Sequence, residues 1–287
     1  MLSVRVFRSA AQGGGIAPPE AALRAASPQG ASALGRPGGA TAPPEAALRA
    51  ASPQGASALG RPGGAFVAYE VPRRPAQTVL DVVTHIQRCL DPTLAYRFAC
   101  RVGMCGSCAM TVNGRARWTC RTHVEAVARD GALEIAPLAN LPVIRDLVTD
   151  MSAFFDKGAR AMGSFVPTAT RHDEFATVAP SSKARRAVDA AIECIGCGVC
   201  YASCDVVSWN PTYLGPAALN RAWTLVNDPR DGARDERLAA VAGDAGCHAC
   251  HTHQSCTDRC PKALAPTASI AGLKRATALA ALSGRMR

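Results

Sequence analysis

Aromatic residues are scarce in this chain of 287 residues, at 5%, although 48% of the residues are apolar. No uncharged apolar run reaches the roughly 18 residues that a membrane-spanning helix needs, so we expect any membrane attachment to come through partners. The N-terminus lacks the continuous apolar core and cleavage site of a secretory signal peptide. These absences argue against a membrane-spanning chain and against an exported one held together by disulfides.

The formal net charge is +10, yet the sequence has no Lys/Arg tract with interleaved aromatic residues. Because the arginines are scattered, we expect no nucleic-acid partner. A basic surface that faces acidic proteins or anionic lipid accounts better for the charge.

Cysteine, in contrast, is abundant: there are thirteen, and eleven fall into three spaced runs. In a chain without a signal peptide, clustered cysteines indicate metal or redox sites. The runs consist of Cys100, Cys105, Cys108 and Cys120; of Cys194, Cys197, Cys200 and Cys204; and of Cys250, Cys256 and Cys260.

The first run has the plant-type spacing of a [2Fe–2S] site, with Cys120 as the fourth thiolate. Gly103 and Gly106 lie between the ligands and let the backbone approach the sulfurs. A structural zinc site is the alternative, but it more often shows two Cys-x2-Cys pairs.

The second and third runs follow the bacterial two-cluster spacing, in which the last Cys of each run ligates the other cluster. This exchange rule predicts a [4Fe–4S] cluster, whose ligands are Cys194, Cys197, Cys200 and Cys260. The other site keeps three thiolates, Cys204, Cys250 and Cys256, because His253 stands where a fourth Cys is expected. Three thiolates predict a [3Fe–4S] cluster.

Two further cysteines lie outside the three runs. Cys247 pairs with Cys250 in a Cys-x2-Cys spacing, and His248, His251 and His253 share the loop, so a fourth ligand for the third site stays open. We expect Cys247 to be a small buried residue instead. Cys89, three residues after Ile86 on a predicted helix, is expected to be a packed apolar side chain.

Residues 16–65 contain a tandem repeat, whose identical copies run from Ala17 to Ala40 and from Ala42 to Ala65. Rich in Ala, Gly and Pro, it buries too little apolar surface to offset its ordering entropy. Strand patterns flank it, at Leu2–Val6 and Val67–Val71. We therefore expect an insertion in the turn of a first β-hairpin, with residues 16–65 extruded; a partner-binding arm is the alternative.

The remaining pattern predicts an α+β chain. A helix capped by Thr78 and Asp81 ends at Asp91-Pro92, and Asn113-Gly114 predicts a type I′ hairpin. Further elements are expected as a strand at Leu133–Ile135, a connecting helix from Pro142 to Phe155, a loop over 160–180, and helices at Ala217–Val226 and Ala268–Leu282. We predict a β-grasp [2Fe–2S] ferredoxin domain over 1–145, which includes the repeat loop 16–65, and an all-α bacterial-ferredoxin-like domain over 146–287 that holds two clusters.

These motifs together resemble the iron–sulfur subunit of succinate dehydrogenase and fumarate reductase, over about 2–8 and 66–282. The resemblance rests on Cys100-Arg101-Val102-Gly103-Met104-Cys105-Gly106-Ser107-Cys108-Ala109-Met110, Ile144-Arg145-Asp146-Leu147-Val148, Cys194-Ile195-Gly196-Cys197-Gly198-Val199-Cys200, Asn210-Pro211, Gly215-Pro216-Ala217-Ala218 and Cys260-Pro261-Lys262. Departures from the family pattern are Val102, Asp205-Val206 and His253.

The resemblance implies an electron relay with no acid–base residue for succinate chemistry in this chain. A flavoprotein partner would oxidise succinate at FAD, and electrons would pass through the three clusters to quinone beside membrane-anchor subunits, with or without haem b. Trp209 and His251 match the positions that approach the quinone in the family.

Two alternatives stay open: the same relay run in reverse, as in quinol:fumarate reductase, and a zinc-stabilised binding module without redox function. The short, Arg-containing N-terminus permits a mitochondrial transit peptide and a place on the matrix face. Because a β-grasp domain needs Leu2–Val6 as its first strand, we expect a peripheral protein on the cytoplasmic face of a bacterial inner membrane instead.

Overall fold

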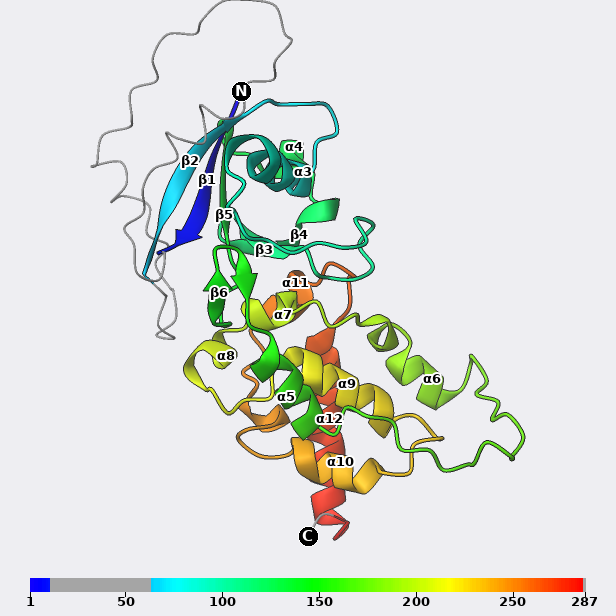
Figure 1. Ribbon diagram of the computed structural model, residues 1–287. Helices are drawn as coiled ribbons and strands as arrows, with labels where there is room; N and C mark the ends of the chain where they lie inside the picture. Colours follow the sequence, from blue (N-terminus) through cyan, green and yellow to red (C-terminus); the bar gives the residue numbers. More distant parts are fainter. Residues whose placement is uncertain (11–62, 286–287) are drawn as a thin grey trace, which may run out of the picture.

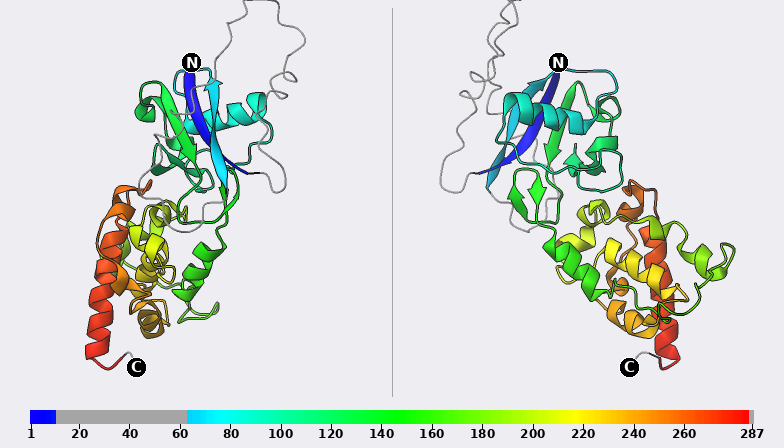
Figure 2. Two further views of the ribbon diagram at one scale, coloured as in Figure 1. Left: turned by 90° about the vertical axis from the view of Figure 1, so that its left-hand side faces the viewer. Right: turned by 45° about the vertical axis from the view of Figure 1, so that its right-hand side comes forward.

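The computed structural model describes residues 1–10 and 63–285, and these form a mixed α/β structure (Figure 1). A five-stranded sheet in the order β2-β1-β5-β3-β4 occupies the N-terminal part, and helices make up the C-terminal part. The strands of the sheet are β1 (Leu2–Ser9), β2 (Gly64–Val71), β3 (Ala109–Val112), β4 (Arg115–Trp118) and β5 (Ala132–Ala136). Figure 2 shows from two further sides that the sheet and the helical part lie one above the other.

The predicted first hairpin is confirmed. β1 pairs antiparallel with β2, Val4 opposite Tyr69, and pairs in parallel with β5 on its other side. The pairing extends to Ser9 opposite Gly64, so β2 begins inside the last two residues of the repeat and not at Phe66. The remainder of the repeat lies outside the described residues, and its expected extrusion stays a prediction.

Helix α3 (Val79–His85) starts as expected: Thr78 accepts a hydrogen bond from the amide of Asp81, and the Asp81 carboxylate accepts one from the amide of Thr78. The helix then widens into a π-helical turn, η1 (Ile86–Leu90), before Asp91 ends it. Our expectation of a packed Cys89 is wrong, since this side chain is exposed. A π turn holds more residues than an α turn, so Cys89 no longer lies above Ile86.

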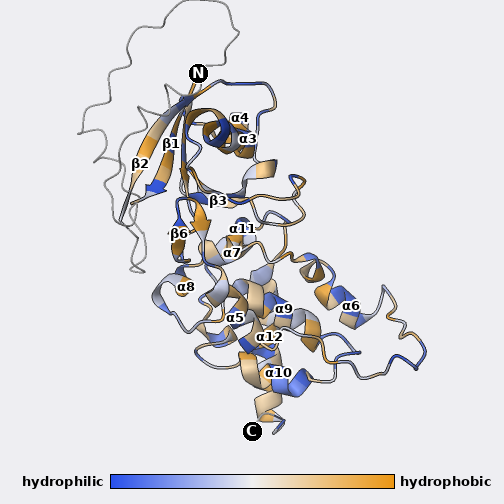
Figure 3. Ribbon diagram, in the orientation of Figure 1, coloured by the Kyte–Doolittle hydropathy of each residue, from blue (hydrophilic) through white to orange (hydrophobic). Residues whose placement is uncertain are grey.

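The connection between β3 and β4 is the predicted tight turn, because Asn113 and Gly114 have φ values of +48° and +74°. Alternation along the hairpin divides its side chains between two cores. Met110 and Val112 pack under α3 with the buried residues of β1 and β5, whereas Ala116 and Trp118 join the core of the helical part. The hairpin therefore contributes side chains to both cores. Figure 3 shows hydrophobic and hydrophilic residues alternating along the strands and helices of both parts.

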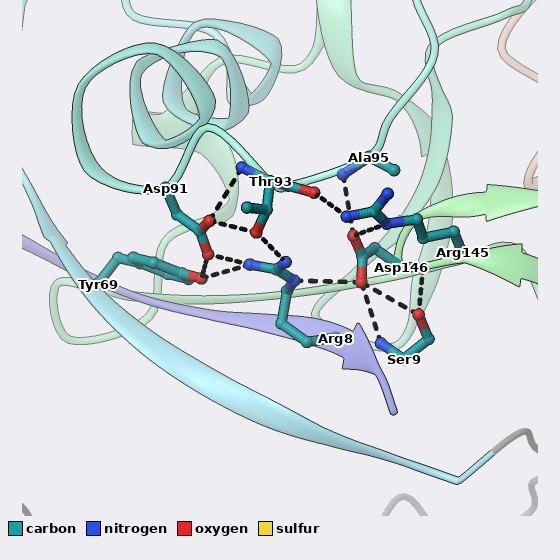
Figure 4. Close-up of polar contacts among 8 residues, drawn as sticks. All are labelled: Arg8, Ser9, Tyr69, Asp91, Thr93, Ala95, Arg145 and Asp146. Carbon is teal, nitrogen blue, oxygen red and sulfur yellow. Dashed lines mark hydrogen bonds and ion pairs between the residues drawn. The ribbon is translucent and has the colours of Figure 1, made fainter. Parts of the chain in front are cut away.

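The helix expected from Pro142 to Phe155 is wrong. The chain instead forms a short hairpin, β6 (Val143–Arg145) and β7 (Val148–Thr149), and only then the helix α5 (Ser152–Arg160). Asp146 turns the hairpin with φ of +48°, and its buried carboxylate accepts hydrogen bonds from the amides of Ser9 (3.0 Å) and Ala95 (2.9 Å) (Figure 4). These distant partners override the local helical spacing.

The helical part follows the prediction more closely, with no strand among the described residues after Thr149. Its α-helices are α6 (Lys183–Val188), α7 (Val199–Ala202), α8 (Asp205–Trp209), α9 (Pro216–Val226), α10 (Arg234–Val241), α11 (Ser255–Asp258) and α12 (Pro266–Leu282). Short helical segments are α4 (Val124–Val127), η2 (Thr119–Arg121), η3 (Ala191–Glu193) and η4 (Cys247–Ala249). Within the part of the chain that the structure describes, no helix is both long and apolar enough to cross a bilayer.

The expected loop over 160–180 holds no helix or strand, and a buried ion pair anchors it. The guanidinium of Arg237 lies 2.8 Å from the carboxylate of Asp231, and both side chains are fully buried. Asp231 also accepts a hydrogen bond from the amide of Val166, while Arg237 donates to the carbonyl oxygen of Ser164. These contacts attach the loop between α5 and α6 to α10 and to the turn before it.

Candidate iron–sulfur cluster sites

The first cysteine loop, residues 100–108, folds so that backbone amides point at sulfur. The amides of Met104 and Cys105 lie 3.2 and 3.3 Å from Sγ of Cys100, and the amide of Cys100 lies 3.5 Å from Sγ of Cys105. This amide, followed by the Ser107 hydroxyl, lowers the pKa of Cys105 to about 6. The loop thus stabilises thiolates, the form that binds iron.

Cys108 and Cys120 complete the first site from the inside. Both are buried, and Cys120 lies in η2, directly after β4. Burial raises the pKa of Cys120 to about 11, and a hydrogen bond and the charge of Cys108 and the charge of Cys100 add to the rise. The first site thus combines the more exposed Cys100 and Cys105 with the buried Cys108 and Cys120. As thiolates these side chains repel one another, and a bound cationic group would relieve that repulsion.

The second site collects its thiols from the loop before α7 and from the end of the third run. Cys200 is buried in α7, and burial raises its pKa well above the ordinary value. The charges of Cys197, Cys194 and Cys260 raise it further. Cys197 and Cys260 are partly buried and Cys194 is exposed. Gathering four thiolates beside an apolar core is unfavourable unless iron compensates their charge, so these residues fit a cluster.

The third site is a small cavity. Cys204, Cys250 and Cys256 line it together with His253 and Tyr213. Burial raises the pKa of Cys204 to about 11, and the charges of Cys256 and Cys250 contribute. The amide of Thr252 lies 3.4 Å from Sγ of Cys250, as an amide would for a bound thiolate. The three expected thiols thus converge.

Cys247 is placed differently. It is fully buried, and its Sγ lies 3.8 Å from the hydroxyl of Thr277 on α12, outside the residues that line the cavity. His248 contacts the same hydroxyl at 3.1 Å. His253, which occupies the position of the missing Cys, lies 3.2 Å from the carboxylate of Asp205. The buried position of Cys247 agrees with its expected packing role.

Trp209 and His251, the two residues expected beside a quinone, lie together on the surface above the third site. Trp209 is 56% exposed, and its ring centre is 6.1 Å from that of His251. His253 completes the group, 6.0 Å from Trp209 and 6.1 Å from His251. The sequence analysis considered His253 as the replacement of a Cys and as a possible fourth ligand, although its place two residues after His251 was a signal for a shared aromatic surface.

Among the ranges that the structure describes, no three His, Cys, Asp or Glu side chains are grouped closely enough to hold a single metal ion. The thiols lie in sets around shared spaces, and the cysteine sulfurs of a cluster are divided among two or more iron atoms.

Comparisons with known proteins agree with this arrangement. A family model described as a 2Fe-2S iron-sulfur cluster binding domain matches residues 60–156, and one described as a 4Fe-4S dicluster domain matches residues 190–264. The fumarate reductase iron-sulfur subunit of Mycobacterium tuberculosis is 39% identical over 222 residues, which cover 76% of this chain and 87% of that protein.

The succinate dehydrogenase iron-sulfur subunit of Paracoccus denitrificans is 37% identical over 198 residues, 68% of this chain and 74% of that protein. A chain of the Mycobacterium smegmatis Sdh1 complex in the apo form shares the fold, with a TM-score of 0.70 and 24% identity over 96% of this chain and 95% of that one. The chain therefore belongs to the family of succinate dehydrogenase and fumarate reductase iron–sulfur subunits.

Proposed function

We propose that this chain is the electron-transfer subunit of a succinate:quinone oxidoreductase. The observation that carries the proposal is the convergence of eleven cysteines into three separate sets, in each of which several sulfurs lie close enough to influence one another. In this proposal, Cys100, Cys105, Cys108 and Cys120 hold [2Fe–2S]. The other sets are Cys194, Cys197, Cys200 and Cys260 for [4Fe–4S], and Cys204, Cys250 and Cys256 for [3Fe–4S].

The clusters supply one-electron transfer when bound, and the chain's own residues place them in series and tune their potentials. Succinate chemistry belongs to an FAD-containing flavoprotein partner in this proposal. We propose a division into a β-grasp domain over 1–145 and a helical domain over 146–287, with the boundary inside the β6–β7 hairpin.

A cationic cleft beside the first site supports contact with an acidic protein partner. Arg117 and Arg121 line it together with Arg259, and the exposed side chains of Val102 and Met104 lie at its edge. Positive charge beside exposed apolar side chains is a favourable combination for a protein interface. We assign the flavoprotein to this side.

We assign the site where electrons leave the chain to the aromatic surface of Trp209 and His251, above the third site. We propose that quinone binds there, beside membrane-anchor subunits, and that the subunit is peripheral on the cytoplasmic face of a bacterial inner membrane. Amphipathic rings such as Trp and His provide both an apolar surface and a hydrogen-bond donor to a quinone carbonyl.

Quinol:fumarate reductase is the second candidate, because relatives with both names match this chain. Rates of succinate-dependent quinone reduction and of quinol-dependent fumarate reduction by the purified complex decide between them. If fumarate reduction is the faster of the two, the proposed direction of electron flow is wrong.

The cluster assignment is tested by iron and acid-labile sulfide analysis together with EPR. We expect about nine iron atoms per chain and, in the oxidised sample, the signal of a paramagnetic three-iron centre. A colourless, zinc-containing protein would contradict the proposal. About ten iron atoms and no such signal would instead show a four-iron third cluster.

The variant His253→Cys tests whether the third cluster has three iron atoms because a thiolate is missing at position 253. It restores the missing thiolate at the edge of the cavity, so the three-iron signal should disappear and the iron content should rise by about one atom. His251→Cys is the matched control, since it places a thiol at a neighbouring position without the bacterial spacing. It should leave the three-iron signal in place.

A further inference from the structure

Trp118 lies where the first and second cysteine loops meet. It is the last residue of β4, and the strand alternation turns it with Ala116 toward the helical part. Its side chain is 6% exposed and shares a core with Cys120 and the partly buried Cys197. The tryptophan thus contacts the environment of two proposed clusters at once.

The orientation of the indole follows from its neighbours. A Cβ atom on Gly103 would lie 3.1 Å from Cζ3 and 3.2 Å from Cε3 of Trp118, so the benzene edge of the ring lies against the first loop. In an indole, Nε1 lies on the opposite side of the ring from these two carbons. The N–H therefore points away from Gly103.

This N–H is buried and makes no hydrogen bond within the described residues. Unsatisfied buried donors are unfavourable and therefore rare in native proteins. The side of the ring that carries the N–H faces the helical part, where Cys197 packs against the same core. Of the sulfurs there, Sγ of Cys197 is the one to which the indole is in position to donate.

We propose that Trp118 is a positioning residue of the second site, whose indole N–H donates to Sγ of Cys197 when that sulfur is an iron-bound thiolate. The proposal rests on the cluster assignment proposed above. A donor to a ligand sulfur stabilises the more negative, reduced state, so it raises the reduction potential of that cluster. The sequence analysis assigned no role to Trp118, because no motif includes it.

The variant Trp118→Phe removes the N–H and keeps an aromatic ring. In the cluster-loaded chain within its complex, a redox titration followed by EPR should show the second cluster harder to reduce. At a fixed ambient potential, the ratio of reduced to oxidised cluster should fall several-fold; a tenfold fall corresponds to about 59 mV for one electron. The first cluster should shift less, because the N–H points away from Gly103 in its loop.

Trp223→Phe is the matched control, since the Trp223 indole donates to the carbonyl oxygen of Ala187 and packs against Gly272, away from the cysteines. The reduction potentials of the clusters in this variant should equal those in the parent protein. A Trp118→Phe protein with full iron content and an unchanged second potential would overturn the inference and leave the proposed function intact. A parent protein without iron and sulfide would overturn the proposed function itself.

If Trp118→Phe assembles poorly, a labelled protein decides the question without this variant. In a chain with Trp209→Phe and Trp223→Phe, Trp118 is the single remaining tryptophan. With ¹⁵N-labelled tryptophan, pulsed EPR of the reduced second cluster should show a weak ¹⁵N coupling through the sulfur. A spectrum without that coupling would contradict the hydrogen bond.

Discussion

Gly106 lies so close to Cys197 that a Cβ atom on Gly106 would be 2.6 Å from Cβ of Cys197. The loop of the first proposed cluster and the loop of the second therefore touch through backbone and Cβ atoms alone. Electron transfer between centres depends on their separation, and this contact places the two cysteine sets next to each other.

Gly106→Ala should disturb this contact. The new methyl group meets Cys197, and φ of +74° is unfavourable for any residue with a Cβ, by about 1–2 kcal/mol. Gly114→Ala is a matched control, because φ is also +74° there and a Cβ would meet nothing within 4 Å. We expect loss of second-cluster iron only in Gly106→Ala; equal loss in both variants would show that backbone strain is the cause.

Asp146→Ala should destabilise the N-terminal part by about 3 kcal/mol, because it leaves the half-buried Arg8 guanidinium without one of its carboxylate partners and two amides without an acceptor. Thermal unfolding of the full chain measures the effect. Asp156→Asn, an exposed change on α5, should stay within about 0.5 kcal/mol of the parent. Similar midpoints for the two variants would contradict the role assigned to Asp146.

Tyr69 makes stability depend on alkaline pH. Burial raises its pKa to about 12, and the hydrogen bond that its hydroxyl donates to Asp91 at 2.7 Å adds to the rise, against the opposing effect of Arg8. Because the folded pKa exceeds the unfolded value of about 10, this contribution is complete below pH 10 and is lost as the pH rises toward 12.

Tyr69→Phe should therefore flatten the fall in unfolding midpoint between about pH 10 and 12, while being less stable than the parent at neutral pH by about 1 kcal/mol. Subtracting the phenolate absorbance titration of the variant from that of the parent gives the curve of Tyr69 itself. A difference curve with a midpoint near pH 10 would rule out the assigned environment.

His251→Ala should lower quinone-dependent turnover by about tenfold, the effect of losing one interaction of about 1.4 kcal/mol. Artificial acceptors that take electrons from the chain before the quinone site should still be reduced at the parent rate. His172→Ala, an exposed histidine in the loop after α5, is the control and should leave both activities unchanged. Equal loss with both types of acceptor in His251→Ala would point to cluster assembly instead.

Features that depend on neighbours in the chain were predictable from the sequence. The Thr78–Asp81 cap, the Asn113-Gly114 turn and the pairing of β1 with β2 all appear as expected. The cysteine spacings likewise indicate which thiols belong to each proposed ligand set. Each of these signals resides in a few adjacent residues, or in a strand whose alternating pattern marks its buried face.

Only the tertiary structure decided the features that join distant residues. The spacing of Ile144 and Phe155 favours a helix, yet hydrogen bonds from Ser9 and Ala95 to Asp146 impose the β6–β7 hairpin, and both apolar side chains are exposed. The contact of β4 with α7, which brings Trp118 into one core with Cys200, likewise arises only in the folded chain. Local chemistry determined which residues could serve as caps, turns and ligands, whereas burial of charge and close packing between remote segments determined which side chains meet, because those free energies arise only after the chain has folded.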